Sequence, residues 1–381
     1  QAGKTMGNAI QSASATIPDF GDVVLDLQVK AAGNAANLLN FLRDSPVGRR
    51  YAEPLKDLLV DGKFDGAFKL VLPVRRMEEM SLDGSAELTA RKLEQLRYDQ
   101  HFVDVGGTVR FSQSGLAADG LDVGFRGRRA KLSIDVGSFV SDPTQVFEAR
   151  LSGLFPASEV FTDMPALAPV VAHLQGESAW NALVAVAAPQ ANAEGAVRLM
   201  LDSDLVGTAI DLPAPLDKLA ASRWPLHIAM DLPYAGRLAQ VRLADRLAIS
   251  AQLPAADKAL AVRLHFGADD AAAPPTAGIV VDGHIGQLDA GGWIRVVSAG
   301  QASAGVLVQQ IDIRADETLL GGRQFKDVGL RIDSSLEATR VNIDGTAIAG
   351  ELDFPRGLAT QGIVARLVRV HWPDAPPGAA D

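Results

Sequence analysis

The stretch SDLVGTAIDLPAPLDK, residues 203–218, couples a short apolar strand to a proline-rich corner. Val206 and Ile210 suit a β-strand, because β-branched residues pack well on a pleated surface. Proline has no backbone N–H for a ladder and therefore belongs at strand ends and edges. Pro213 and Pro215 thus predict that this strand ends abruptly at a rim of a sheet, where such residues also discourage edge-to-edge aggregation.

The same alternation of apolar and polar residues recurs through most of the chain. A period of two is the pattern of a strand with one buried face. Aspartate-glycine pairs at 61–62, 83–84, 282–283 and 344–345 are interpreted as turns between such runs. The clearest alternating runs are 23–29, 68–72, 121–136, 197–201, 226–232, 247–253, 260–266, 328–332 and 341–354.

Strands that follow one another with short turns favour antiparallel pairing over parallel strands joined by crossover helices. We therefore predict a fold with an all-β majority. It is expected to be an elongated, twisted, antiparallel β-groove, shaped like a taco, with short helical insertions. Residues 1–381 are expected to form one such elongated section.

Two segments break the alternation and are predicted as helical insertions, 33–46 and 156–176. In the first, the apolar residues at helical spacing are Ala35, Leu38, Phe41 and Leu42. In the second they are Leu167, Val170, Val171 and Leu174, with Gly176 as a C-cap. A weaker insertion is expected around 291–300. Residues 267–278 are small, acidic and proline-containing, and are expected to be an exposed loop.

The composition excludes several classes of function. The 36 basic and 46 acidic residues give a net charge of −10, which argues against nucleic acid as a partner because such partners need a basic face. There is no cysteine, so disulfides and thiolate metal sites are excluded. No run approaches the length of about eighteen apolar residues that a membrane-spanning helix needs. The polar start and the PDAPPGAAD end are expected to belong to a soluble piece of a larger protein.

Residues that could carry catalysis or bind a metal do not form a known constellation. The sequence contains no GxSxG, HExxH, GxGxxG or GxxxxGK[ST] motif. His227 and His265 alternate with apolar strand residues and are expected to face solvent. The aspartates of the opening stretch, Asp204, Asp211 and Asp217, are spaced too widely for a calcium loop. We expect no enzyme, no cofactor and no metal site.

A cluster of basic residues in GFRGRRAK is the densest positive charge of the chain. It contains Arg126, Arg128, Arg129 and Lys131. The cluster could contact an anionic lipid headgroup. The alternative, that it is a solvated hairpin tip, is the commoner role of a short charge run at a turn.

The sequence predicts many strands with one apolar face, and its few short helices are too small to cover them all. Such a face is buried against a second sheet, against helices or against a ligand. A sandwich would close on itself, whereas a groove-shaped sheet would leave an apolar trough for acyl chains. Periodicity predicts both equally.

Four stretches of the sequence are similar to the motifs of one known family. The opening stretch is similar to a family strand that ends in S-D-L-x-G and leads to an L-P-A-P-L-x-K corner. FPASEVFTDMPALAPVVAHLQGESAW is similar to the family's helical insert and to the strand start that follows it, here Gly176, Ser178 and Trp180. ETLLGGRQFKDVGLRI resembles the family's C-terminal G-R-x-F-x-D-L-x-L strand entry, and FDGAFKLVLPVRRMEEMSLDGSAELTARKLE resembles its recurrent strand pair. Through these motifs the chain resembles YhdP-type members of the AsmA-like superfamily, over roughly residues 20 to 372.

The resemblance implies a periplasmic part of a larger, inner-membrane-anchored protein of a Gram-negative bacterium. Its expected function is intermembrane phospholipid transport, with acyl chains shielded in the groove and both membranes reached through parts absent from this chain. The alternative is a structural or adhesive envelope protein with a closed core and no ligand. The residues expected to line the groove are Leu226, Ile228, Met230, Ile249, Leu264, Val328, Leu330 and Ile332.

Overall fold

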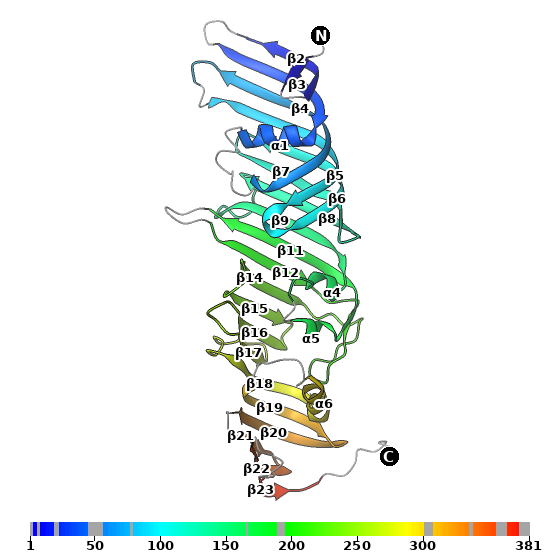
Figure 1. The fold of residues 1–381 in the computed structure, drawn as a ribbon, viewed down its shortest axis with the longest axis vertical. Coiled ribbons are helices and arrows are strands. Elements are labelled where there is room, and N and C mark those ends of the chain that lie inside the picture. The colour runs from blue at the N-terminus through cyan, green and yellow to red at the C-terminus, as the bar shows by residue number, and fades with distance from the viewer. Residues whose placement is uncertain are drawn as a thin grey trace. The chain divides into compact units, whose positions relative to one another are not determined.

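A computed structural model describes residues 3–5, 8–18, 23–44, 56–76, 79–164, 167–188, 195–300, 308–334, 338–355 and 364–372. It confirms the predicted fold class, because strands make up most of these residues, pair mainly antiparallel and form an open sheet with a few short helices (Figure 1). Among the residues so described, no helix has the length and apolar character to cross a bilayer.

The chain divides into two compact units. Unit 1 comprises Gln1–Leu154 and Trp180–Leu199, and unit 2 comprises Phe155–Ala179 and Met200–Asp381. Each unit is described separately below.

Unit 1 is an antiparallel meander in which each strand from β1 to β9 pairs with the next. Its elements are β1 (Gly3–Thr5), β2 (Asn8–Thr16), β3 (Val24–Asn34), α1 (Ala35–Asp44), β4 (Leu58–Pro73), β5 (Ser81–Gln95), the 3-10 turn η2 (Leu96–Tyr98), β6 (Gln100–Ser112), β7 (Gly115–Phe125), β8 (Arg128–Gly137) and β9 (Gln145–Phe155). The strand β11 (Ser178–Ala187) and the start of β12 (Val197–Ser203) follow.

The register of unit 1 brings the apolar residues of successive strands onto one face. Residues directly opposite each other in neighbouring strands point to the same side of a sheet. One such row, read from β3 to β9, is Val29, Phe68, Gly84, Phe111, Leu116, Val136 and Phe147. The alternation in the sequence therefore builds one continuous apolar face in unit 1.

Unit 2 contains both antiparallel and parallel pairs. Strands β14 to β17 pair in succession antiparallel, β18 lies parallel to both β17 and β19, and β19 to β23 are again antiparallel. Its elements are α4 (Ala157–Val160), α5 (Ala168–Val171), β10 (Leu174–Gly176), β13 (Thr208–Ile210), β14 (Leu226–Leu232), β15 (Leu238–Leu243), β16 (Leu247–Gln252), β17 (Ala261–Phe266), β18 (Gly278–Asp289), α6 (Ala290–Gly300), β19 (Val308–Leu320), β20 (Arg323–Ser334), β21 (Ala338–Asp344), β22 (Ile348–Pro355) and β23 (Val364–Val370).

The two parallel pairs are not part of a simple meander, and each needs a connection that returns along the sheet. Residues 267–277, where an exposed loop was expected, form the first return. This loop is tied to the sheet, because Arg242 Nη1 donates to Ala268 O at 2.8 Å and Arg263 Nε donates to Ala273 O at 2.9 Å. The weak insertion expected around 291–300 is helix α6, which lies in the second connection.

The predicted insertion over 33–46 corresponds to α1, which begins where Asn34 Oδ1 accepts the N–H of Ala36 at 2.7 Å. The side chains of Phe41 and Leu42 lie outside the described residues. The insertion predicted over 156–176 contains two short helices among its described residues, α4 and α5, but its end, Leu174–Gly176, is a strand paired with β13. Gly176 therefore lies in a strand with φ +97° and does not cap a helix.

The proline corner of the opening stretch has a specific contact in the fold. Strand β13 ends at Ile210, whose N–H donates to Lys218 O at 2.9 Å, so the corner is a closed loop. Ala214 O accepts the N–H of Asp289 at 3.1 Å and Nε1 of Trp293 at 2.9 Å. The corner thus binds the start of α6 through hydrogen bonds. This is a more specific role than the expected one of ending a strand at a sheet edge.

Three of the four aspartate-glycine pairs interpreted as turns are inside strands, and this interpretation was wrong for them. Gly62, Gly84 and Gly283 lie in β4, β5 and β18, and only the pair at 344–345 ends a strand. A Cβ at Gly84 would lie 2.5 Å from Cζ of Phe111. Glycine is therefore needed there for close approach and not for a turn.

Candidate functional site

The apolar face of unit 2 is the strongest candidate site. Its middle is a row of directly opposed residues, one from each strand from β14 to β22, and all of them are aliphatic. We call it the central row: Ile228, Val241, Ile249, Leu264, Val281, Ile311, Ile332, Val341 and Leu352. With strands about 4.8 Å apart, eight spacings make this row about 38 Å long.

The eight residues expected to line a groove all lie on this face. Ile228, Ile249, Leu264 and Ile332 belong to the central row itself. Leu226 and Leu330 lie in the neighbouring row, which runs through Leu243, Leu247, Phe266, Gly283 and Ile313. Met230 and Val328 are on the same face, two residues farther along their strands. The register thus brings all eight together, and their contact with lipid stays a prediction.

The central row is not fully covered. Ile228 is buried, with 6% of its surface exposed, whereas the other eight members are partly exposed. Burying aliphatic surface contributes about 25 cal/mol per Å². A run of eight partly exposed aliphatic side chains can therefore bind aliphatic ligand surface along its whole length, by contact alone and without a directed polar group.

The opposite face of the same strands is polar and pairs its charges between strands. Arg331 Nη2 lies 2.8 Å from Asp312 Oδ2, and Arg340 Nε lies 3.1 Å from Asp353 Oδ1. Such exposed pairs contribute little to stability. They make this face suitable for water and unsuitable for acyl chains.

The two strand histidines are on the polar face and each contacts one aspartate. His227 Nδ1 lies 2.7 Å from Asp202 Oδ1, with about half of each side chain exposed. His265 Nδ1 lies 2.5 Å from Asp282 Oδ1, and Asp282 also binds Arg263 at 2.5 Å. His265 is only 24% exposed, so it faces a salt-bridge network more than solvent. In the described part of the chain no three acidic or histidine side chains are placed to share a metal ion.

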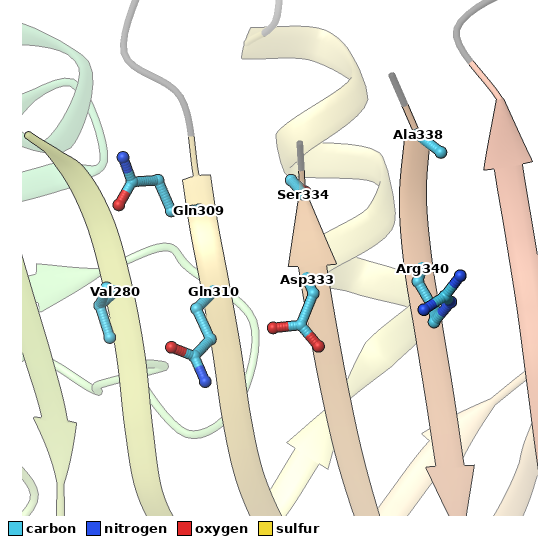
Figure 2. A pocket seen from close by; sticks show the side chains of 7 residues that line it. All are labelled: Val280, Gln309, Gln310, Asp333, Ser334, Ala338 and Arg340. Atoms are coloured by element: carbon cyan, nitrogen blue, oxygen red, sulfur yellow. The ribbon is translucent and has the colours of Figure 1, made fainter. Parts of the chain in front are cut away.

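A shallow pocket on the polar face has a different character. Its volume is about 320 Å³, and Figure 2 shows that its side chains come from β18, β19, β20 and β21. Val280, Gln310, Asp333 and Arg340 form one row of opposed residues across these strands. The pocket offers amide, carboxylate and guanidinium groups, so it suits a small polar molecule and not an acyl chain.

The basic cluster is a hairpin tip in unit 1. Arg126, with φ +50°, lies in the turn between β7 and β8, and its guanidinium is 5.2 Å from the ring centre of Phe125. Lys131 Nζ lies 2.7 Å from Asp122 Oδ1. Arg128 and Arg129 open β8. The structure brings the four together on one hairpin, and contact with a headgroup remains a prediction.

Sequence reasoning missed a buried polar cluster at the end of the opening stretch. Lys218 is 4% exposed, and its ammonium donates to Leu205 O and Thr208 O at 2.7 Å and to Leu219 O at 3.1 Å. Burial lowers the pKa of Lys218. Because all three protons are used on backbone oxygens, this lysine holds the loop together and is not available to a substrate. No sequence pattern marks it, since its partners are main-chain atoms.

The aspartates of the same stretch are local structural residues. Asp204 Oδ1 accepts the N–H of Val206 at 3.0 Å. Asp211 and Asp217 are exposed and lie on either side of the proline corner. They do not converge.

Comparison with known proteins identifies a family. A family model described as "YhdP protein" matches residues 1–381, the whole of the chain. No curated protein and no solved structure matches.

Proposed function

Because the chain belongs to the YhdP family, we propose that it carries phospholipids between the inner and outer membranes of a Gram-negative envelope. Family membership supports a role in envelope lipid transport. The finer proposal is that acyl chains lie on the apolar face of the sheet while they cross the periplasm. In this role the chain is a periplasmic part of a larger protein, it performs no catalysis, and the membranes are reached through other parts.

The observation that carries the proposal is the partial exposure of the central row. Eight of its nine members remain accessible over seven strand spacings, about 34 Å, although an ordinary protein core would bury them. Exposed apolar surface on this scale marks a site for a ligand or a partner. The row also consists of similar aliphatic positions in sequence. Similar positions bind a chain with similar free energy at each step, so a lipid can move along them without being trapped.

The alternative of a structural envelope protein with a closed core draws on unit 1. There the apolar face on which α1 packs continues into fully buried positions such as Val105, Leu121 and Val136. A closed core would hold no lipid. The two possibilities are therefore distinguished by measuring lipid on the purified protein.

The test is native mass spectrometry of the full chain purified from cells without detergent. We expect bound phospholipid at one or more molecules per chain. In the double variant Ile249→Asp with Ile332→Asp, two partly exposed positions of the central row gain carboxylates, and lipid occupancy should fall strongly because ionised groups would lie against hydrocarbon.

The matched control is Gln240→Asp with Asn342→Asp. It adds the same two charges to the same sheet, but on the polar face, where Gln240 opposes Ser250 and Asn342 opposes Arg331. The control should keep its lipid. A lipid-free wild-type chain, or equal occupancy in both double variants with both folded by circular dichroism, would reject the proposal in favour of the closed core.

A further inference from the structure

Helix α1 lies against the apolar face of unit 1 (Figure 1). Leu38 packs on a cluster of buried residues from β3, β4 and β5, namely Val29, Ala31, Phe64 and Ala86. Leu39 and Ala35 of the same helix are also buried, with 8% and 2% of their surfaces exposed. The helix therefore buries its apolar side on the face that the alternating strands create.

Hydrogen bonds from two described side chains of the helix add to this packing. Asn37 Nδ2 donates to Oδ1 of Asn8 at 3.3 Å, and Arg43 Nη2 donates to Lys56 O at 3.1 Å and to Leu58 O. A helix of ten residues is marginal in water by itself, so α1 depends on its tertiary contacts. Such a segment opens more readily than the strands beneath it, which are hydrogen-bonded on both sides.

Burial along β3 and β4 changes with distance from α1. Val29, Ala31 and Phe64, in the cluster that Leu38 contacts, are 6–7% exposed. On the same face of the same strands, farther from the helix, the residues become partly exposed: Leu25, Leu27, Leu70 and Leu72. On β3 and β4 the face is thus one continuous apolar surface, of which α1 covers one section and leaves the next partly exposed, whereas Leu82 of β5, opposite Leu70, is buried.

We propose that the surface beneath α1 is a second acyl-chain site, which α1 covers and an acyl chain uncovers by competing for the same residues. This inference rests on the proposed function, because it needs acyl chains on the neighbouring exposed section. The groups that the helix leaves behind are aliphatic or aromatic, so the ligand class is hydrocarbon. The contact that Asn37 makes with Asn8 joins two neutral groups, and Arg43 is already partly exposed.

The first test concerns the helix alone and needs no lipid. Hydrogen exchange of the full chain, read by mass spectrometry, should show the amides of α1 exchanging at least about a hundredfold faster than those of β4 and β5. Protection of α1 equal to that of the strands would overturn the inference while leaving the proposed lipid transport untouched.

The second test places lipid on the surface. The full chain is loaded from phosphatidylethanolamine–phosphatidylglycerol vesicles that contain a phospholipid with a diazirine on its acyl chain, and adducts are mapped after illumination. In the wild type, adducts should form at Leu27 and Leu70 and rarely at Phe64. The double variant Leu38→Asn with Leu39→Asn weakens the packing of α1. If the fraction of molecules with α1 displaced rises about tenfold, the share of adducts at Phe64 should rise by the same factor.

The matched control is Asn40→Gln on the exposed side of α1, which keeps a side-chain amide oxygen near Arg43 and should leave the distribution of adducts unchanged. Circular dichroism and the exchange of β4 confirm that the sheet is intact in each variant. Adducts at Leu27 and Leu70 with no rise at Phe64 in the double variant would overturn the inference alone. Absence of adducts on both units would overturn the proposed function as well.

Discussion

Replacing Lys218 by methionine tests whether the buried ammonium holds the end of the opening stretch. Methionine keeps a similar length and apolar stem but donates no hydrogen bond. Three bonds to backbone oxygens are lost, at 2.7, 2.7 and 3.1 Å. Hydrogen bonds from charged groups contribute about 1.5–3 kcal/mol each, so the gross loss is about 4.5–9 kcal/mol.

Part of that loss is offset, because the variant no longer keeps a charge out of water, which costs several kcal/mol in a folded protein. The expected net destabilisation of unit 2 is therefore about 3 kcal/mol. The assay is hydrogen exchange by mass spectrometry in increasing urea, read on peptides that cover β12 to β14, which avoids assuming that both units unfold together. Lys258→Met is the control. Lys258 is exposed and donates to Gly236 O at 3.2 Å, so less than about 0.5 kcal/mol is expected. Equal urea midpoints for the two variants would refute the reasoning.

Three further predictions concern packing, pH and the proline corner. Gly84→Ala should destabilise unit 1 by about 1–3 kcal/mol in urea unfolding, because its Cβ would meet the ring of Phe111, and Phe111→Leu in the same chain should restore part of the loss. Burial, and then nearby carboxylates including Glu148, raise the pKa of Asp135. Its folded pKa lies above the unfolded value, so its contribution to the stability of unit 1 should fall as pH rises from 3.8 through the raised pKa, and Asp135→Asn should remove that part of the pH dependence. Trp293→Phe removes one hydrogen bond and should lower the stability of α6 by about 1 kcal/mol, measured by its amide exchange.

The sequence predicts the face of each strand well and the partner of each strand less well. Alternation determines which side of a strand is apolar, and residues such as Ile228, Leu264 and Ile332 share one face in the structure as their spacing suggests. Pairing depends on connections between strands. The return through 267–277 and through α6 makes β18 parallel to its neighbours, and a loop-like composition does not distinguish a hairpin from a return.

Other features could not be predicted from the sequence, because a single residue type serves several roles. Glycine after aspartate is typical of turns, yet Gly62, Gly84 and Gly283 lie in strands where another residue comes too close for a side chain. The helical spacing within 156–176 placed Leu174 on the apolar face of a helix. Instead Leu174 pairs its backbone with Ile210, a partner 36 positions away that local periodicity does not reveal. Nothing in the composition around Lys218 reveals its three main-chain partners.

Each residue of the central row is directly opposite one residue in each neighbouring strand. This register determines which mutations are tolerated in proteins of this kind. Exchanging one aliphatic residue for another leaves the row intact, but deleting a single residue inside a strand turns every later side chain of that strand to the opposite face. Extra residues are already present where the ladder shifts, beside Ile279 in the β18–β19 pair and beside Gly350 in the β22–β23 pair. Each of these bulges accommodates an extra residue in one strand of the pair. Relatives should therefore diverge widely in residue identity while strand lengths stay nearly constant, with insertions confined to the loops and bulges.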